Sequence, residues 1–358
     1  MTAAGRVVTF GLTPAWQRVM RFGRFDPDRV NRARETAACA AGKAVNAARA
    51  AATALRASSR GADAGVVAGE QRPVATGGRA VAAVAPLGGL TGALAAAQLV
   101  ADDVEVVRED PGHELRVCVT VIDDATGAVT ELVEETPAMT GAVAQRLVER
   151  CRALGEGADA VGGTGGALGG AVLVCSGTLP PGVGAEVYGR VIGGGGGGGR
   201  VGRRGSWSWV VVDAKGEPLT AALAAAASAS VAAVAKVNRE ELEQTTACGA
   251  ALEEGIRRLH TLGARCVVVT AGGGDVVVSD GDVLRRYRVP EVRRLNTTGC
   301  GDCMAGVLAA MLASGRDFLD AVVWAVAAAS ASAETLLPAV YDIERAAQLE
   351  REVRQWAA

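Results

Sequence analysis

The sequence predicts an α/β protein in which helices cover both faces of a mostly parallel sheet. Two observations lead to this class: short, continuously apolar runs recur along the chain, and Ala/Leu-rich stretches lie between them. Strands buried on both faces read as unbroken apolar runs, and their alternation with helices is typical of parallel sheets. Apolar residues make up 49% of the 358 residues and aromatic residues only 3%, so we expect a large, aliphatic core.

The expected elements follow from these two patterns in chain order. Runs rich in valine predict strands, because β-branched residues favour extended backbone. The predicted strands are 6–12, 83–89, 116–123, 171–177, 209–216, 232–238, 265–273 and 275–280. Stretches rich in alanine, leucine and glutamate predict helices, because these residues lose little freedom there. The predicted helices are 44–55, 92–100, 142–154 and 241–263, and the chain from 317 on also reads as helices.

Several segments differ from this alternation. Residues 16–36 and 112–135 are more polar and alternate apolar with polar side chains, which is typical of strands with one solvent face. We expect them to form a small flap beside the main sheet. Glycine-rich segments at 155–170 and 193–205, and a further segment at 57–79, read as surface insertions. The chain 1–358 is then one domain.

Composition narrows the class of partner. The formal net charge of −2 gives no reason to expect nucleic acid or an anionic membrane. We find no apolar run of transmembrane length and no signal-peptide pattern, so we expect a cytoplasmic protein. Its cysteines are then free, mostly buried thiols. Cys300 and Cys303 form a CxxC pair, for which a redox pair or half of a metal site is the alternative.

Polar or small residues follow five of the predicted strands. In an open parallel sheet, ligands bind outside the carboxyl ends of the strands. We therefore expect a long cleft along this edge of the sheet. The five positions are 12–14, 176–177, 213–216, 236–238 and 270–273.

The most informative stretch is NTTGCGDCMAG, residues 296–306. Strong helix formers follow Gly301, so a helix should begin near it and the glycines should form the loop that opens this helix. The start of a helix presents unpaired N–H groups and a partial positive charge, which together attract anions. The pattern predicts an anion-binding loop beside the carboxylate of Asp302, with Cys300 as a small residue between two glycines.

NTTGCGDCMAGVLAAML resembles the C-terminal signature of the ribokinase-like (PfkB) sugar kinases, D/N-T-T/V-G-A-G-D. AGKAVNAARA at 41–50 resembles their N-terminal signature, G-G-K-G-x-N-x-A-R. The stretch SGTLPPGV and the start L-T-P-A are similar to the branch of 1-phosphofructokinase, tagatose-6-phosphate kinase and the minor 6-phosphofructokinase. The resemblance covers nearly the whole chain apart from the glycine-rich segments.

This resemblance implies a three-layer α/β/α domain with a small β lid, formed by about 16–36 and 112–135. It also implies ATP and Mg²⁺ as cofactors and transfer of the γ-phosphoryl group to a sugar hydroxyl. Backbone N–H groups of Gly299, Cys300 and Gly301 would stabilise the transferred group. Asp302 would accept the hydroxyl proton as general base. Homodimers through the β lid are usual in such kinases.

The resemblance further implies the ligand contacts. The positions that match nucleotide contacts are Lys236, Asn238, Thr270, Gly272, Thr297, Gly299 and Gly301, with small residues of 327–339 against the adenine. Asn238 and Glu241 match the motif N-x-x-E, which organises Mg²⁺ and phosphate indirectly. Gly42, Lys43 and Asn46 match contacts to the acceptor sugar. Arg116 matches a lid arginine that grips the sugar phosphate, a task that suits a guanidinium.

Two departures from the family pattern concern the acceptor. The family start N-P-A-x-D has an aspartate that holds sugar hydroxyls, whereas this chain reads T-P-A-W-Q and places the uncharged Gln17 there. The signature GGKG reads AGKA. We expect phosphorylation of a phosphorylated ketohexose, fructose 1-phosphate giving fructose 1,6-bisphosphate. Fructose 6-phosphate, tagatose 6-phosphate, and an unphosphorylated sugar or nucleoside are alternative acceptors, and a non-enzymatic sugar-phosphate sensor is the alternative from another class.

Overall fold

The computed structural model describes residues 5–62, 79–161, 170–193, 207–249 and 251–355. Its main sheet contains β1 (Val7–Phe10), β4 (Val81–Pro86), β5 (Glu105–Glu109), β8 (Val172–Ser176), β9 (Trp209–Asp213), β10 (Ala232–Asn238), β11 (Cys266–Thr270), β12 (Val276–Ser279) and β13 (Leu284–Tyr287). The strand order is β13-β12-β11-β10-β9-β8-β1-β4-β5. Strands from β11 to β5 are parallel to their neighbours, and β12 and β13 are antiparallel at one edge.

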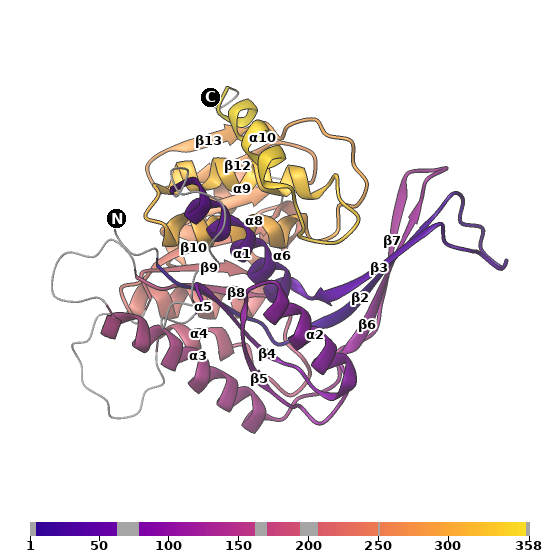
Figure 1. Ribbon diagram of the computed structural model, residues 1–358. Helices are drawn as coiled ribbons and strands as arrows, with labels where there is room; N and C mark the ends of the chain where they lie inside the picture. The colour runs from indigo at the N-terminus through magenta and orange to yellow at the C-terminus, as the bar shows by residue number, and fades with distance from the viewer. Residues whose placement is uncertain (1–4, 63–78, 162–169, 194–206, 250, 356–358) are drawn as a thin grey trace.

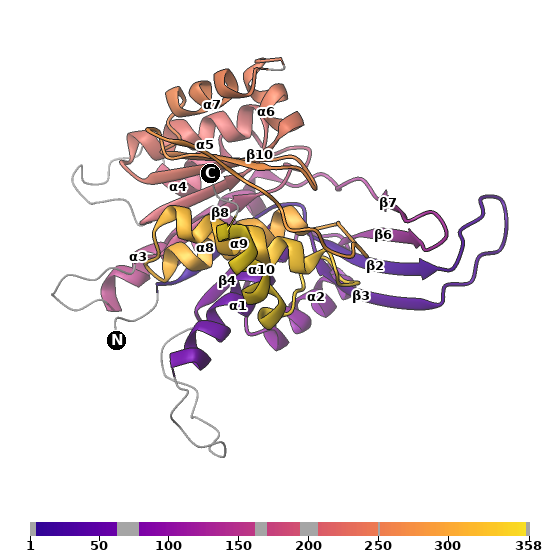
Figure 2. The same cartoon turned by 90° about the horizontal axis from the view of Figure 1, so that it is seen from above.

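Helices cover both faces of this sheet, as Figures 1 and 2 show. One layer contains α1 (Lys43–Ala62), α2 (Gly89–Ala101), α8 (Cys300–Ala313), α9 (Phe318–Ser332) and α10 (Ile343–Gln355). The other contains α3 (Gly141–Val161), α4 (Val187–Gly193), α5 (Gly216–Ser228), α6 (Arg239–Thr246) and α7 (Leu252–Thr261). Successive strand residues alternate between two aliphatic cores: Val211 packs on the side of α8, whereas Val210 and Val212 pack on the side of α5. The predicted three-layer α/β class is confirmed.

A second, four-stranded sheet projects from the body (Figure 1). It contains β2 (Ala15–Phe22), β3 (Glu35–Ala41), β6 (Arg116–Asp123) and β7 (Ala128–Val133), in the order β3-β2-β6-β7. β2 and β6 are parallel, and the other two pairs are antiparallel. These strands lie in or beside the segments 16–36 and 112–135. The role of this sheet as a lid over the acceptor stays a prediction.

The expected helix 241–263 is two helices in the structure. α6 ends at Thr246 because Ala247 has a left-handed backbone conformation with φ of 51°, and Gly249 follows with φ of 57°. A left-handed residue ends a helix by turning the chain away from the helix axis. The two threonines, Cys248 and Gly249 at this point are weak helix formers, so the sequence contained a signal for the break that the predicted helix 241–263 did not use.

The ends of several other elements also differ from expectation. β4 begins two residues before the predicted strand 83–89 and ends before Gly88 and Gly89, which open α2. The short edge strands β5 and β13 were not predicted. α3 continues to Val161, inside the glycine-rich segment 155–170, and α1 continues to Ala62. Most of the segments 57–79 and 193–205 lies outside the described residues. Within the described part of the chain, the helices are too short or too polar to cross a membrane.

Candidate active site

Three neighbouring parallel strands end in polar side chains that meet. The register of β8 and β9 pairs Ser176 with Asp213, and β10 continues the row with Lys236. The Ser176 hydroxyl donates to Asp213 Oδ2 at 3.1 Å, and Lys236 Nζ lies 3.2 Å from Asp213 Oδ1. The Asp213 carboxyl is fully buried, and a buried charge is tolerated only when it is paired and hydrogen-bonded. Asp213 is therefore the centre of an ion-pair cluster at the predicted edge.

Lys43, the first residue of α1, joins the same cluster. Its Nζ lies 3.5 Å from Asp213 Oδ1 and 3.2 Å from Glu241 Oε1. Burial alone would lower the pKa of Lys43, but the charges of Asp213, Asp302 and Glu241 outweigh burial and raise it above its ordinary value. Burial opposes ionisation of Asp213 in turn, and the charges of Lys236 and Lys43 hold its pKa below the ordinary value. Both groups are ionised at neutral pH.

The motif N-x-x-E forms a capping box at the start of α6. Asn238 Oδ1 accepts a hydrogen bond from the Glu241 N–H at 2.8 Å, and Glu241 Oε2 accepts one from the Asn238 N–H at 2.9 Å. This reciprocal pair satisfies two N–H groups at the helix start. It also fixes both side chains at the border of the cavity that they line.

α8 begins at Cys300, directly after the glycine loop. Gly299 has a φ of 77°, and a Cβ there would lie 2.8 Å from Pro338 Cβ, so only glycine fits without strain. A Cβ on Gly301 would lie 3.2 Å from Lys236 Nζ, which places the ammonium directly against the loop. The Cys300 N–H makes a long bond of 3.4 Å to the Thr297 carbonyl. The loop thus combines the positive end of a helix with a lysine charge.

Asp302 lies in the first turn of α8 and is buried. Asn46 Nδ2 donates to Asp302 Oδ2 at 2.8 Å. This contact depends on a close approach of α1 and α8, because a Cβ on Gly306 would overlap the Ala47 carbonyl. Burial and the nearby Asp213 charge raise the pKa of Asp302 to about 6, against the opposing effects of Lys43 and Asn46. A carboxyl group with this pKa is suited to accept a proton near neutral pH.

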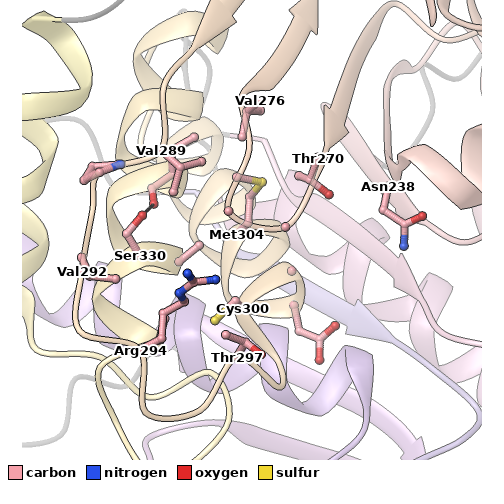
Figure 3. A pocket seen from close by; sticks show the side chains of 18 of the residues that line it. Asn238, Thr270, Val276, Val289, Val292, Arg294, Thr297, Cys300, Met304 and Ser330 are labelled. Atoms are coloured by element: carbon pink, nitrogen blue, oxygen red, sulfur yellow. Dashed lines mark hydrogen bonds between the residues drawn. The ribbon is translucent and has the colours of Figure 1, made fainter. Parts of the chain in front are cut away.

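A large cavity lies over this loop (Figure 3). Its volume is about 800 Å³, within the ordinary range of roughly 300–1,000 Å³ for small-molecule sites. Asp302 and Cys300 lie at its floor. Its polar walls include six predicted nucleotide positions: Lys236, Asn238, Thr270, Gly272, Thr297 and Gly301. Its apolar end is formed by Val276, Val289, Val292, Val326, Ala329 and Ala333, two of which belong to the segment 327–339.

Two of the predicted acceptor residues line a smaller pocket beside the large cavity. Gly42 and Lys43 line this smaller pocket with Thr13, Pro14 and Ser176. Lys43 lines this pocket and the large cavity alike, so the two spaces meet at its side chain. Asn46 is buried, and its Oδ1 has no hydrogen-bond partner in the described part of the chain. An unpaired acceptor beside the proposed base is suited to a hydroxyl donor from a ligand.

The two predicted lid residues lie outside both pockets. Gln17 is buried within the four-stranded sheet, where its Nε2 donates to the Thr120 hydroxyl at 2.7 Å. Arg116 donates to the carbonyls of Thr13 at 3.1 Å and Glu134 at 3.3 Å. The structure therefore does not bring Gln17 or Arg116 into direct contact with Asp302.

The cysteine pair does not have the properties of a redox or metal centre. Burial and the charge of Asp302 raise the pKa of Cys300 to about 11. Cys303 is fully buried, and burial also raises the pKa of its thiol. Redox chemistry and metal binding both need the thiolate, which these shifts disfavour.

The side chains of the site fit Mg²⁺ only as an ion that they contact through water. The described residues contain no group of three or more His, Cys, Asp or Glu side chains that could hold a metal. Mg²⁺ in kinases keeps several waters and is held by one or two carboxylates together with substrate phosphates. Both Glu241 oxygens already have partners, Lys43 and the Asn238 N–H. Glu241 and Asn238 therefore fit a hydrated ion that they contact through water.

Two functional candidates were given no role of their own by the sequence prediction. Asp213 lies within the strand-end position 213–216, where a cleft was expected, but its ion pairs were not predicted. Arg294 lines the cavity from the segment between β13 and α8, and nothing in the sequence distinguished it from its neighbour Arg293.

Comparison with known proteins gives concordant matches. Residues 205–339 match the profile of the pfkB family carbohydrate kinases. The chain is 27% identical over 266 residues to "ATP-dependent 6-phosphofructokinase isozyme 2" of Escherichia coli (strain K12), covering 73% of this chain and 78% of that protein. It is 26% identical over 315 residues to "1-phosphofructokinase" of Xanthomonas campestris pv. campestris, covering 86% and 84%. The crystal structure of phosphofructokinase-2 from Escherichia coli in complex with potassium superposes with a TM-score of 0.74 at 22% identity, covering 99% of this chain and 100% of that one. At this identity, the structural match establishes the fold.

Proposed function

Because the chain carries a pfkB family carbohydrate kinase domain and is a sugar kinase, we propose that its acceptor is a ketohexose that already carries a phosphate. Fructose 1-phosphate, giving fructose 1,6-bisphosphate, is the proposed substrate. One observation carries the proposal: the buried carboxyl of Asp302 lines the large cavity at the start of α8, and it is hydrogen-bonded to Asn46 on α1, the helix whose first residue, Lys43, lines both the large cavity and the smaller pocket.

Asp302 is the proposed general base. Its carboxylate takes the proton from the acceptor hydroxyl, and the resulting oxygen attacks the terminal phosphorus of the donor. The bond from that phosphorus to its bridging oxygen breaks, and the nucleoside diphosphate leaves with the electron pair. Asn46 holds the Asp302 carboxylate in place through the hydrogen bond from Nδ2. Burial and the neighbouring Asp213 charge raise the pKa of Asp302, so that the base is strong enough to accept the proton.

The glycine loop is the proposed anion site. The start of α8 and the Lys236 ammonium present positive charge where the phosphoryl group is transferred. Such preorganised charge, together with positioning, is the main source of rate enhancement in phosphoryl transfer. ATP is the proposed donor, with its base against the apolar end of the cavity. Mg²⁺, when bound near Glu241 and Asn238, would neutralise phosphate charge.

Two observations support a phosphorylated acceptor. Two relatives bear the names 6-phosphofructokinase and 1-phosphofructokinase, and each aligns with most of this chain. Arg116 ties β6 to the Thr13 carbonyl, next to the smaller pocket. A phosphate group on an acceptor bound at the smaller pocket would lie near the Arg116 guanidinium.

A coupled assay of ADP release across a panel of acceptors tests the proposal. The panel contains fructose 1-phosphate, fructose 6-phosphate, tagatose 6-phosphate, free fructose and a nucleoside, with Asp302→Asn as the control for background hydrolysis. We expect the highest kcat/KM for fructose 1-phosphate. A free sugar or nucleoside that surpasses all sugar phosphates would refute the phosphorylated acceptor. Binding of sugar phosphates without any turnover would favour the sensor.

We further propose that two copies of the chain associate through the four-stranded sheet. Leu132 and Val133 on β7 are 57% and 54% exposed, which is unusual for large apolar side chains on a strand. Light scattering on the purified protein should give the mass of a dimer, and Leu132→Lys should shift that mass toward the monomer. An unchanged mass in this variant would exclude this sheet as the interface.

A further inference from the structure

The cavity contains one cation whose role the family resemblance does not explain. Arg294 lies on the segment between β13 and α8 and extends into the cavity near Cys300 and Thr297 (Figure 3). Its side chain is exposed, and within the described residues it forms no hydrogen bond or ion pair. An arginine that has no protein partner and faces a cavity is free to bind a ligand.

The other cations of the cavity are already paired. Lys236 forms an ion pair with Asp213, and Lys43 forms ion pairs with Asp213 and Glu241. With Asp302, this cluster contains two lysines and three carboxylates, so its net charge is not positive. A nucleotide polyphosphate carries several negative charges, and among the described residues Arg294 is the cavity's unpaired positive charge.

The position of Arg294 suits the polyphosphate better than the base. Its Nη1 lies 3.6 Å from the position that a Cβ on Gly273 would take. Gly273 belongs to the turn after β11, next to the predicted nucleotide positions Thr270 and Gly272. The guanidinium thus lies close to this turn and to Thr297 and Cys300 at the start of α8 (Figure 3).

We propose that Arg294 binds a phosphate group of the nucleotide donor and is a donor-binding residue of this kinase. The inference rests on the proposed function, because it takes a nucleoside polyphosphate as the ligand of the cavity. A guanidinium presents two parallel N–H groups that match two phosphate oxygens, whereas a lysine offers a single point charge. Because Gly273 has no side chain, the phosphate can approach Arg294 and the turn together.

Calorimetric titration of the whole protein tests this inference without requiring turnover. The variants are Arg294→Ala, Arg294→Lys and the matched control Arg293→Ala, which removes the same charge from the adjacent exposed residue that does not line the cavity. The ligands are ADP and adenosine. A charge-assisted contact of typical strength predicts that Arg294→Ala weakens ADP binding by about 10- to 150-fold. We expect unchanged adenosine binding in every variant, partial recovery of ADP affinity in Arg294→Lys, and wild-type behaviour in Arg293→Ala.

The outcomes separate this inference from the proposed function. Unchanged ADP affinity in Arg294→Ala overturns the inference and leaves the kinase proposal intact. Equal losses for ADP and adenosine overturn the phosphate contact and assign Arg294 to the base or ribose. Equal losses in Arg293→Ala and Arg294→Ala also overturn it, because they show a diffuse charge effect. A wild-type protein that binds no ADP overturns the proposed function and this inference with it. Thermal unfolding of each variant verifies that the fold is retained.

Discussion

Asp302→Asn should separate catalysis from stability, because the proposed base carries its charge in a buried position. The variant keeps the shape of the side chain and an oxygen that accepts the hydrogen bond from Asn46. It removes the base, and the loss of general-base catalysis lowers rates by roughly 10²–10⁴-fold. Turnover should therefore fall by orders of magnitude while nucleotide binding persists.

The same change should stabilise the folded protein at neutral pH. The pKa of Asp302 rises from 3.8 to about 6 on folding, chiefly through burial. The protonated form therefore stabilises the folded state fully below pH 4, and this contribution is lost as pH rises through 6. At 1.36 kcal/mol per pKa unit, the loss amounts to about 3 kcal/mol. Asparagine does not ionise, so the variant does not lose this stabilisation as pH rises. The buried cluster of the variant then contains two lysines and two carboxylates.

Urea unfolding of both proteins between pH 4 and pH 8 measures this difference. The free energy of unfolding of Asp302→Asn, relative to wild type, should rise by up to about 3 kcal/mol from pH 4 to pH 8, with most of the rise between pH 4 and pH 6. In parallel, wild-type kcat/KM should fall as pH drops below about 6. A stability difference that is constant across pH would refute the raised pKa. A variant with near-normal kcat would refute the role of Asp302 as base.

Three further variants test the remaining parts of the site. Arg116→Ala should raise KM for the phosphorylated acceptor by about 10- to 150-fold and leave KM for ATP unchanged, because it removes a charge-assisted contact on the acceptor side only. Asp213→Asn should destabilise the protein by about 3–5 kcal/mol in urea unfolding, since it breaks a buried ion pair with Lys236. It should also shift the acid limb of kcat/KM to lower pH, because the Asp213 charge raises the pKa of Asp302. Gly299→Ala should lower the stability by about 1–3 kcal/mol in thermal unfolding, because φ is 77° and a Cβ would press on Pro338.

Each of these expectations has an outcome that contradicts it. Equal damage to ATP and acceptor kinetics in Arg116→Ala would place the arginine outside the acceptor site. A pH profile of Asp213→Asn that matches wild type would show that Asp213 acts on folding and not on Asp302. Wild-type stability in Gly299→Ala would mean that the loop can relax without cost.

The fold class could be predicted from the sequence because strands buried on both faces leave a strong pattern. Runs such as VVTF and CVVVT contain no charged residue and no polar residue other than threonine, and these runs are β1 and β11. The boundaries could not be predicted in the same way. The break between α6 and α7 depends on the backbone conformation of Ala247, and alanine is the strongest helix former, so the signal lay only in its neighbours. The edge strand β13 contains two arginines and lacks a continuous apolar run.

The site was predictable where a local pattern carries the chemistry. The glycines around Cys300 predicted the start of α8, and the helix begins there. Contacts between distant parts of the chain were not predictable, because no spacing records them. Asp213 and Lys43 are 170 positions apart and meet only after β9 and α1 are placed. Arg294 and Arg293 have the same side chain, and only the cavity distinguishes them.

The short connection between the four-stranded sheet and the body means that this sheet cannot be exchanged on its own. β3 ends at Ala41 and α1 begins at Lys43, so a single residue separates them. That residue, Gly42, has a φ of 99°, and a Cβ on it would lie 2.8 Å from Pro14 Cα. A chimera that exchanged this sheet for that of another kinase would therefore displace the first turns of α1, which hold Lys43 beside Asp213 and Asn46 beside Asp302. The four-stranded sheet and the cluster around Asp302 are mechanically linked here, and an engineer would have to transplant the sheet and α1 as one unit.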